Sequence, residues 1–343
     1  RLTIWCSSQG HFGVRDRTSR VLGIPVSEIK VVPMEIGGGF GGKNPIYLEP
    51  AASVLSKKTG HPVKMTMTRA EVLEASGPTS GGHIKLKVGV TSAGKITAAQ
   101  AYYAFEGGAY PGAPISGAAA AIFSPYVIDN VRIDAFDVMT NKPKTEAYRA
   151  PGAPLVCYGA ESIMDELAEA IGMEPMEFRL NNVATEGTRR ADGAINGPLG
   201  AKEVMETTQA HDHYQSPLPQ VEGKLVARGV GMGFCRNNSG MSSAIANVMS
   251  NGRVSLIEGS VDIGGSRTAI AQMFAETLGL KIEDVIPSVG DTDSVGFTSN
   301  TGGSGVAFKT GWVAFETAND IKRQMIKRAA MVWETDESQV EYV

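Results

Sequence analysis

The chain contains, directly after the apolar run 29–36, the stretch Gly37-Gly38-Gly39-Phe40-Gly41-Gly42-Lys43. Five of its first six residues are glycine, which leaves backbone N–H groups unshielded and able to approach a ligand closely. Each glycine costs about 0.5–1 kcal/mol of chain entropy relative to alanine. Because a tight turn needs only one or two glycines, the stretch predicts a ligand-binding loop, with Phe40 as a wall of the pocket.

Three of these glycines also satisfy the G-x-G-x-x-G spacing of a dinucleotide-binding loop: Gly37, Gly39 and Gly42. In that motif the third glycine opens a helix whose N-terminus binds the pyrophosphate. Here Pro45 biases the preceding residue away from helical geometry, and the next helix start is predicted at Glu49-Pro50. Lys43 is followed by Asn44, not by the Ser or Thr of a Walker loop. A nucleotide-dependent dehydrogenase is therefore kept only as an alternative.

The composition indicates a large folded protein that does not bind nucleic acid. The chain has 343 residues, of which 42% are hydrophobic and 20% charged, and its net charge is −4. No basic stripe is present, and no apolar run is long enough to span a membrane. The cysteines (Cys6, Cys157 and Cys235) are widely spaced without a C-x-x-C pair. They do not form a disulfide scaffold, and this chain alone is not expected to build an iron–sulfur or zinc site.

The two ends of the sequence predict a segment of a longer protein or one processed subunit. The chain begins at Arg1 with a pattern typical of a strand already under way, and it has no initiating methionine. It ends at Val343 shortly after a long predicted helix, with no closing element.

Apolar periodicity and turn residues predict a mixed α/β fold. The expected helices are 14–23, 51–59, 160–172, a short one from Pro175, 268–278 and about 308–330. The expected strands are 28–36, 62–68, 83–90, 96–105, 229–235 and a pair within 245–263 that turns at Ser250-Asn251-Gly252.

A weak internal repeat suggests two related halves. Residues 22–29 follow a predicted helix and precede the glycine stretch, and residues 278–285 follow another helix and precede a second glycine-rich stretch, 298–304. Both segments begin with Leu-Gly and continue into a strand. Two such halves would present similar loops to one elongated anionic ligand.

Several segments, in this order, resemble the molybdenum-binding subunit of the xanthine dehydrogenase / aldehyde oxidase / carbon monoxide dehydrogenase family. They are Cys6 to Gln9, the stretch Gly37 to Lys43, Glu146 to Pro154 running into the helix at Ala160, Val261 to Thr268, and Gly290 to Asp293 followed by Thr298 to Ser304. Together they extend over nearly the whole chain.

The resemblance implies two molybdopterin-binding domains with the cofactor between them, residues 1–215 and 216–343, each incomplete at the outer end. The implied cofactor is molybdenum held by the dithiolene of a pterin, which bacteria usually extend to a cytosine dinucleotide. Because the metal takes almost no protein ligands in this family, no His/Cys cluster is expected. [2Fe–2S] clusters and FAD are expected on partner subunits or domains.

The resemblance also implies roles for individual residues. Arg149 would bind cofactor or orient the substrate, the pocket would include Asn44, Phe123 and Pro151, and Ser266 or Thr268 would cap a helix from Thr268. The expected cofactor-binding residues are Gln9, Gly38, Gly39, Phe40, Gly41, Arg149, Gly264, Gly265, Ser266, Thr268, Thr298, Thr301, Gly302 and Ser304.

Four departures from the family pattern narrow the expected activity. Asn44 stands where purine-oxidising members carry glutamate, and no basic residue lies near Phe123. Ala150 stands where carbon monoxide-oxidising members carry cysteine, and Gly265 replaces a frequent glutamine. The family's general-base glutamate, in a Gly-Val-Gly-Glu-like motif, is expected beyond Val343 or on another subunit.

We therefore expect a molybdenum hydroxylase subunit that oxidises an aldehyde or N-heterocycle with oxygen from water and passes electrons to iron–sulfur and FAD subunits. This fragment is expected to be inactive without the remaining part of the molybdenum subunit. A non-catalytic, cofactor-holding half is the second alternative. The expected location is the cytoplasm, with the periplasm as the alternative.

Overall fold

The computed structural model describes residues 1–235, 237 and 239–343, and the chain divides into two compact units. The first unit comprises Arg1–Ser76 together with Asn237–Val343, and the second comprises Gly77–Arg236. The first unit is thus assembled from both ends of the chain, and the second is inserted between them. None of the helices in the described ranges is long and apolar enough to cross a membrane.

The first unit begins with a β-α-β arrangement whose two strands pair in parallel, Leu2 opposite Ile29. Buried Ile4, Val14 and Val31 form its small core. The glycine stretch follows the second strand as a turn, and the next helix starts only at Glu49, as predicted. The elements are β1 (Leu2–Cys6), α1 (His11–Leu22), a 3-10 turn (Val26–Glu28), β2 (Ile29–Pro33), α2 (Glu49–Thr59) and α3 (Arg69–Ala75).

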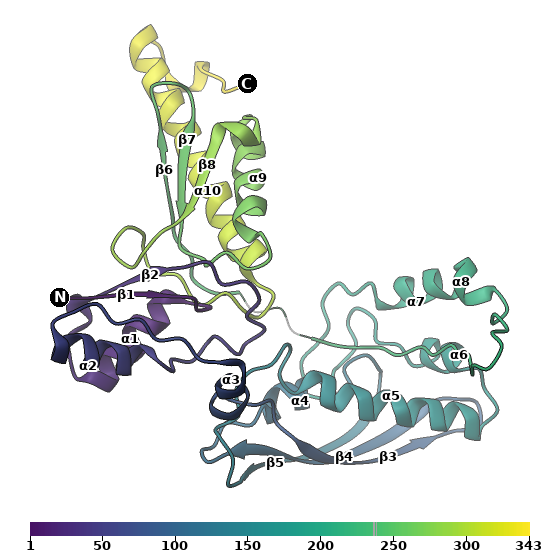
Figure 1. Ribbon diagram of the computed structural model, residues 1–343. Coiled ribbons are helices and arrows are strands. Elements are labelled where there is room, and N and C mark those ends of the chain that lie inside the picture. The colour runs from purple at the N-terminus through teal and green to yellow at the C-terminus, as the bar shows by residue number, and fades with distance from the viewer. Residues whose placement is uncertain (236, 238) are drawn as a thin grey trace. The chain divides into compact units, whose positions relative to one another are not determined.

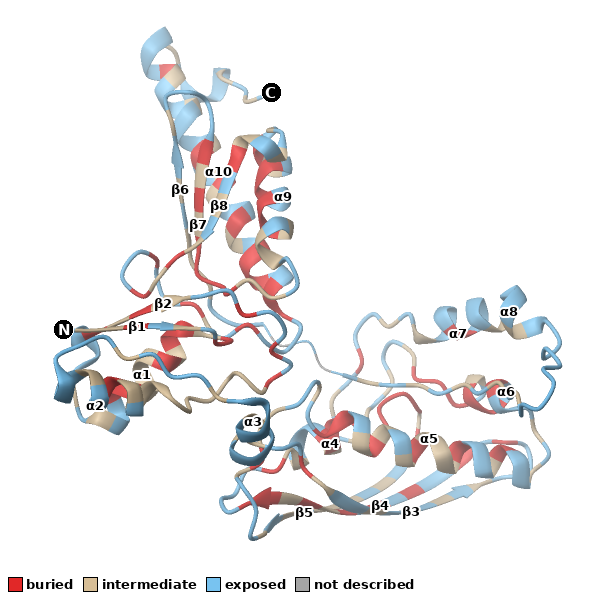
Figure 2. Cartoon of the chain, viewed as in Figure 1, coloured by how far each residue is buried: buried red, intermediate tan, exposed pale blue. Residues whose placement is uncertain are grey.

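The C-terminal part of the first unit repeats this arrangement. Its elements are β6 (Ala244–Val248), β7 (Val254–Glu258), α9 (Ser266–Leu278), a 3-10 turn (Ile282–Asp284), β8 (Val285–Val289), α10 (Val306–Trp333) and a 3-10 turn (Glu337–Gln339). Strand β7 pairs in parallel with β8 and antiparallel with β6. Helices α9 and α10 pack side by side (Figure 1), and residues that are buried in both helices and in β7, red in Figure 2, belong to one core.

The two β-α-β arrangements confirm the repeat predicted from the sequence. Helix α1 ends at Gly23 with φ 65°, and α9 ends at Gly279 with φ 73°. In both, a 3-10 turn follows and the parallel strand begins seven residues after the last helical residue, at 29 after 22 and at 285 after 278.

The two repeats are joined directly by the loop after β8. The Thr292 N–H donates to the Val31 carbonyl at 3.1 Å, and the Val31 N–H donates to the Thr292 hydroxyl at 3.0 Å. Lys30 and Asp291 form an ion pair at 2.7 Å beside these bonds. The start of the fourth predicted segment therefore lies against β2.

The second unit is a three-stranded sheet with one face covered by helix α5 (Figure 1). The central strand pairs antiparallel with the first strand and parallel with the third. Tyr103 and Phe105 pack against Val156 and Met164 in its core. The elements are β3 (Gly82–Val90), β4 (Ile96–Gly108), α4 (Ile115–Ala121), β5 (Asn130–Met139), α5 (Ala153–Ala170), α6 (Pro175–Leu180), α7 (Ala201–Ala210) and α8 (Asp212–Gln215).

A buried ionic network organises the second unit. Glu161 on α5 accepts hydrogen bonds from the Tyr126 hydroxyl at 2.6 Å, Arg179 Nε at 2.8 Å and the Met232 N–H at 2.8 Å. The Arg179 side chain is fully buried. The network therefore fastens α6 and the extended segment around Met232 to α5.

Two predicted strands are wrong. Residues 62–68 are irregular and exposed or half-buried, so their alternating pattern has no sheet to join. Residues 229–235 are extended but unpaired with another strand, because Met232 donates to a side chain and packs with Phe234 against the core of the second unit.

Candidate functional site

Gln9 connects two of the predicted cofactor-binding segments in the first unit. Its side chain is buried, with 4% exposed. The Gln9 Oε1 accepts hydrogen bonds from the N–H groups of Gly41 at 2.8 Å and Lys43 at 3.2 Å. Its Nε2 donates to the Thr301 carbonyl at 2.8 Å, and the Thr301 N–H donates to the Gln9 carbonyl at 2.7 Å. One side chain thus holds the glycine stretch and the 298–304 loop together.

The glycine stretch passes closely over Gln9. A Cβ placed on Gly39 would lie 2.7 Å from the Gln9 side chain, which no real side chain tolerates. The following residue, Phe40, has a positive φ of 52° and is 58% exposed. Its ring lies close over Gly38, since a Cβ added to Gly38 would be 2.5 Å from it. A left-handed conformation is unusual for a bulky residue, so the loop holds the Phe40 ring outward at some cost.

The third predicted segment lies next to this pair of loops. The Thr301 hydroxyl donates to the Val261 carbonyl at 3.1 Å. Beyond Val261 the chain turns through Gly264 (φ 66°) and Gly265 (φ 80°) into α9. Arg267 on α9 lies 3.6 Å from Glu35, just before the glycine stretch. Gln9, the glycine stretch, the 298–304 loop and the start of α9 are therefore one contiguous region.

The predicted cap of α9 is wrong. The N-cap residue is Gly265, and neither Ser266 nor Thr268 precedes the helix, since α9 already starts at Ser266. The Asp262 Oδ1 accepts from the Arg267 N–H at 3.1 Å, so an upstream carboxylate takes this role. Two successive glycines with positive φ fold the chain back far enough for Asp262 to reach the first turn.

The 298–304 loop, which belongs to the fourth predicted segment, is held by hydrogen bonds with several other parts of the first unit. The Thr298 hydroxyl accepts from the Ser243 N–H at 3.1 Å. The Asn300 side chain donates to the Asn44 side chain at 3.1 Å, which brings the predicted pocket residue Asn44 to this loop. Gly302 is exposed, and Ser304 is exposed with φ 54°.

The remaining predicted residues belong to the second unit. Arg149 and Pro151 are exposed in the turn before α5. Ala150, which lies between these two residues in the sequence, has a positive φ of 56°. A Cβ added to Gly152 would lie 2.4 Å from the Pro114 carbonyl oxygen, so the turn is tightly packed there. Phe123 is 1% exposed and packs within the hydrophobic core of this unit.

Sequence reasoning missed two buried charged residues near the loops. Lys309 on α10 is 6% exposed and donates to the 299–300 segment. Glu258 at the end of β7 is fully buried, and its Oε1 has no hydrogen-bond partner among the described residues. Burial raises the pKa of the Glu258 carboxyl to about 8. Each is a single charge within an apolar stretch, which is the signal that could have found it.

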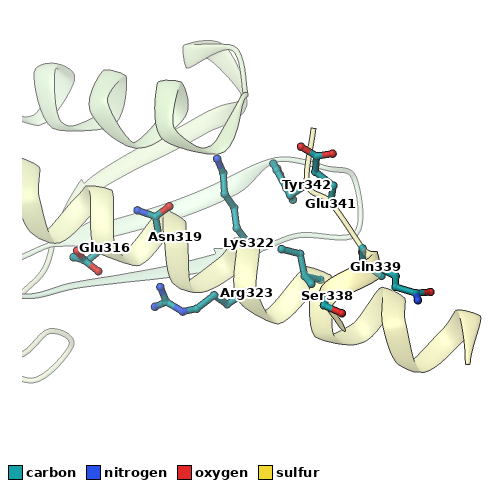
Figure 3. A pocket seen from close by; sticks show the side chains of 10 residues that line it. Glu316, Asn319, Lys322, Arg323, Ser338, Gln339, Glu341 and Tyr342 are labelled. Carbon is teal, nitrogen blue, oxygen red and sulfur yellow. The ribbon is translucent and has the colours of Figure 1, made fainter. Parts of the chain in front are cut away.

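A separate pocket lies at the C-terminal end of the first unit. It measures about 780 Å³ and lies between α10 and the last residues of the chain, with Lys322 and Tyr342 facing each other across it (Figure 3). The Lys322 ammonium is 5.0 Å from the Tyr342 ring centre. None of the residues that line this pocket was predicted for the cofactor site.

The contiguous region suits a ligand bound mainly by backbone amides. Within the described residues, no group of three or more His, Cys, Asp or Glu side chains could hold a metal ion. Added Cβ atoms at Gly264, Gly265 and Gly302 would meet no described atom within 4 Å. Open space beside exposed glycine amides and a helix N-terminus fits the phosphate and pterin parts of a dithiolene-bound molybdenum cofactor, which brings its own metal ligands.

Comparison with known proteins finds relatives along nearly the whole chain. Residues 1–183 and residues 203–343 each match a family model described as a molybdopterin cofactor-binding domain. The chain is 32% identical over 209 residues to the nicotinate dehydrogenase large molybdopterin subunit of Eubacterium barkeri, covering 60% of this chain and 49% of that protein. It is 29% identical over 348 residues to the xanthine dehydrogenase molybdenum-binding subunit of Escherichia coli O157:H7, covering 97% of this chain and 46% of that protein.

The fold agrees as well. The crystal structure of quinoline 2-oxidoreductase from Pseudomonas putida 86 superposes with a TM-score of 0.85 at 21% identity, covering 99% of this chain and 47% of that chain. The chain spans about half the length of the relatives it matches. Because both parts of the chain match molybdopterin cofactor-binding domains, it belongs to the molybdenum-binding subunits of the xanthine dehydrogenase / aldehyde oxidase family.

Proposed function

We propose that this chain is the cofactor-binding part of a molybdenum hydroxylase that oxidises an aldehyde or an N-heterocycle with oxygen derived from water. The observation that carries the proposal is the convergence of the glycine stretch and the 298–304 loop on Gln9, beside the start of α9. Three loops distant in sequence present amides and small side chains at one place, which favours one extended ligand with phosphate and ring parts.

The residues proposed to bind the cofactor act through the backbone and through hydroxyl groups. Gly264 and Gly265 lead into the α9 N-terminus, where the helix dipole favours a phosphate. Thr298, Thr301 and Ser304 supply the hydroxyls of the opposite loop. The remaining proposed cofactor contacts are Gly38, Gly39, Phe40, Gly41, Ser266, Thr268 and Gly302. When bound, the molybdenum–pterin group, proposed in its cytosine dinucleotide form, supplies two-electron oxidation.

Gln9 is proposed to position the loops and to donate to the cofactor. A side-chain amide nitrogen carries two hydrogens, and Gln9 uses one of them for the Thr301 carbonyl. The second remains for a ligand, and its direction is fixed because Oε1 is held by Gly41 and Lys43. Phe40 then provides an apolar surface beside the cofactor.

The substrate pocket is proposed to be polar but uncharged around Asn44. The Asn44 and Asn300 side chains form an amide pair, which offers hydrogen bonds to a carbonyl or ring nitrogen without a fixed charge. An N-heterocycle is also in keeping with the relative that is named as a nicotinate dehydrogenase. Within the second unit, the resemblance to the family supports Phe123 and Pro151 as proposed substrate-pocket residues, and Arg149 as the proposed residue that orients substrate or binds cofactor.

Other parts of the enzyme are proposed on other polypeptide segments, because the chain spans about half of its relatives. The general-base glutamate would lie on the remaining part of the molybdenum subunit, and [2Fe–2S] and FAD subunits would receive the electrons. We propose that residues 1–215 and 216–343 form the two molybdopterin-binding domains. The protein is proposed to lie in the cytoplasm, with the periplasm as the alternative. A cofactor-holding half without activity is the second candidate.

The proposal is tested on the complex purified through this chain, with Arg149→Ala compared with Arg132→Ala. Arg132 is an exposed arginine of the same unit, paired with Asp134 at 2.8 Å. We expect Arg149→Ala to lower turnover or molybdenum content by about tenfold or more, while Arg132→Ala matches the wild type. Equal turnover and equal molybdenum content in both variants would reject the role of Arg149. A complex that holds molybdenum but oxidises no aldehyde or heterocycle would favour the non-catalytic candidate.

A further inference from the structure

Lys309 is a buried cation that faces the back of the 298–304 loop. It lies in the first turn of α10, and Val306 and Ala314 of the same helix belong to the core. Its ammonium donates three hydrogen bonds: to the Ser299 carbonyl at 3.0 Å, the Ser299 hydroxyl at 2.7 Å and the Asn300 carbonyl at 2.8 Å. An ammonium has three donors, and all three are used on two consecutive residues.

These bonds set the direction of two peptide planes. In a trans peptide the C=O and the following N–H point in opposite directions. With the Ser299 and Asn300 carbonyls held by Lys309, the N–H groups of Asn300 and Thr301 point away from it. The Thr301 N–H indeed donates to the Gln9 carbonyl at 2.7 Å.

The same segment carries the contacts made by the candidate site. The Thr301 carbonyl accepts from Gln9 Nε2, and the Asn300 side chain bonds to Asn44. A Cβ placed on Gly10 would lie 3.0 Å from the Asn300 Cα, so the chain after Gln9 lies directly against this residue. A tilt of the 299–300 peptides would therefore move both Gln9 and Asn44.

We infer that Lys309 is a positioning residue of the cofactor site: its ammonium fixes the Ser299–Thr301 backbone and, through it, Gln9 and Asn44. The inference deepens the proposed function and rests on it. Without the cation, the two carbonyls that converge on the buried Lys309 ammonium would lose this donor, and the loop would turn to reach water.

Lysine suits this position better than arginine or a neutral residue. Its compact, tetrahedral ammonium matches three acceptors that converge on one point, whereas the planar guanidinium forms a fork. Lys327, on the exposed surface of the same helix, provides a matched control.

The experiment compares wild type, Lys309→Met, Lys309→Arg and Lys327→Met in the purified complex. Two readouts are measured at a temperature at which all variants stay folded: molybdenum and pterin per chain, and hydrogen exchange of the peptide that contains 298–304. We expect Lys309→Met to keep about a tenth or less of the cofactor, in line with the effect of losing a residue that supports a metal site. Its 298–304 amides should exchange faster, Lys309→Arg should restore part of both readouts, and Lys327→Met should change neither.

Wild-type cofactor content and wild-type exchange in Lys309→Met would overturn the inference. If that variant does not fold, Ser299→Ala carries the test, since it removes one acceptor and keeps the lysine; unchanged exchange and content there would also overturn it. A wild-type complex without molybdenum would instead overturn the proposed function, and the exchange readout would still decide whether Lys309 fixes the loop.

Discussion

Gln9 and the Thr301 backbone exchange two hydrogen bonds across 292 residues of sequence: the Gln9 Nε2 donates to the Thr301 carbonyl at 2.8 Å, and the Gln9 backbone carbonyl accepts from the Thr301 N–H at 2.7 Å. The first repeat of the first unit is thereby joined to the second at the point where both glycine-rich loops lie. Because Gln9 also accepts from Gly41, one amide side chain determines the spacing of the candidate site.

Replacing Gln9 should therefore loosen both loops. Gln9→Ala leaves the Gly41 N–H and the Thr301 carbonyl without their buried partner, at about 1–3 kcal/mol for each unsatisfied group. Gln9→Glu keeps the acceptor but places a carboxylate against the Thr301 carbonyl, so it should also destabilise. Urea unfolding of the purified chain measures both changes. An unfolding free energy within about 0.5 kcal/mol of wild type for Gln9→Ala would show that the side chain does not join the loops.

Gly39 should tolerate no side chain, whereas Gly42 should. A Cβ at Gly39 would meet Gln9 at 2.7 Å, but one at Gly42 would meet only the Gly39 carbonyl oxygen at an ordinary 3.7 Å. We expect Gly39→Ala to cost about 1–3 kcal/mol as overpacking does, and Gly42→Ala to be close to neutral. Thermal unfolding compares the two, and equal melting temperatures would contradict the close approach.

Replacing Ala150 by glycine should stabilise the second unit. Its φ of 56° is left-handed, a conformation that costs a non-glycine residue about 1–3 kcal/mol. Ala150→Gly relieves this strain against a smaller entropic cost of about 0.5–1 kcal/mol, so the second unit should gain stability. Ala150→Val should lose it, because a β-branched residue is worse at positive φ. Opposite shifts in denaturant midpoint are the expected result; shifts of the same sign would count against the strain.

Glu258 should make stability fall as pH rises. Its folded pKa of about 8 lies above its ordinary value of 4.5, because burial disfavours the charged carboxylate. Between these values the folded chain holds a proton that the unfolded chain releases, so this contribution is present at pH 4.5 and is lost by pH 8. Glu258→Gln should remove that slope and be relatively more stable at pH 8.

His11 acts in a lower pH range and provides an internal check. Burial lowers its pKa from 6.5 to about 4, so its contribution favours folding as pH rises from 4 to 6.5. Since both proteins contain His11, the difference between wild type and Glu258→Gln isolates the carboxyl group. Parallel stability curves from pH 5 to 8 would show that Glu258 is not protonated in the folded chain.

The sequence predicted what depends on local signals. The glycine stretch, the helix start at Glu49-Pro50 and the repeated Leu-Gly junctions are short patterns whose cause lies within a few residues, and the structure confirms them. Strand β5 was missed although Val131, Ile133 and Ala135 alternate with polar residues; it joins a sheet only through its parallel pairing with β4, which is distant in sequence.

The site was harder to predict where its contacts are long-range. Nothing around Asp262 indicates that it reaches the Arg267 N–H, since that depends on two glycines with positive φ. The apolar residues around Lys309 indicate that this lysine is buried, but they do not indicate that its ammonium donates to the 299–300 segment. The family resemblance suggested site residues without knowledge of these contacts, but only at positions that belong to the family's motifs.

The central claim is that this chain holds a molybdenum–pterin cofactor at the loops joined by Gln9. The most direct measurement is elemental and pterin analysis of the native complex purified through this chain, with Gln9→Ala as the comparison. The account predicts about one molybdenum and one pterin per chain, and a clear loss of both in the variant. A complex that contains its partner subunits but neither molybdenum nor pterin would contradict it.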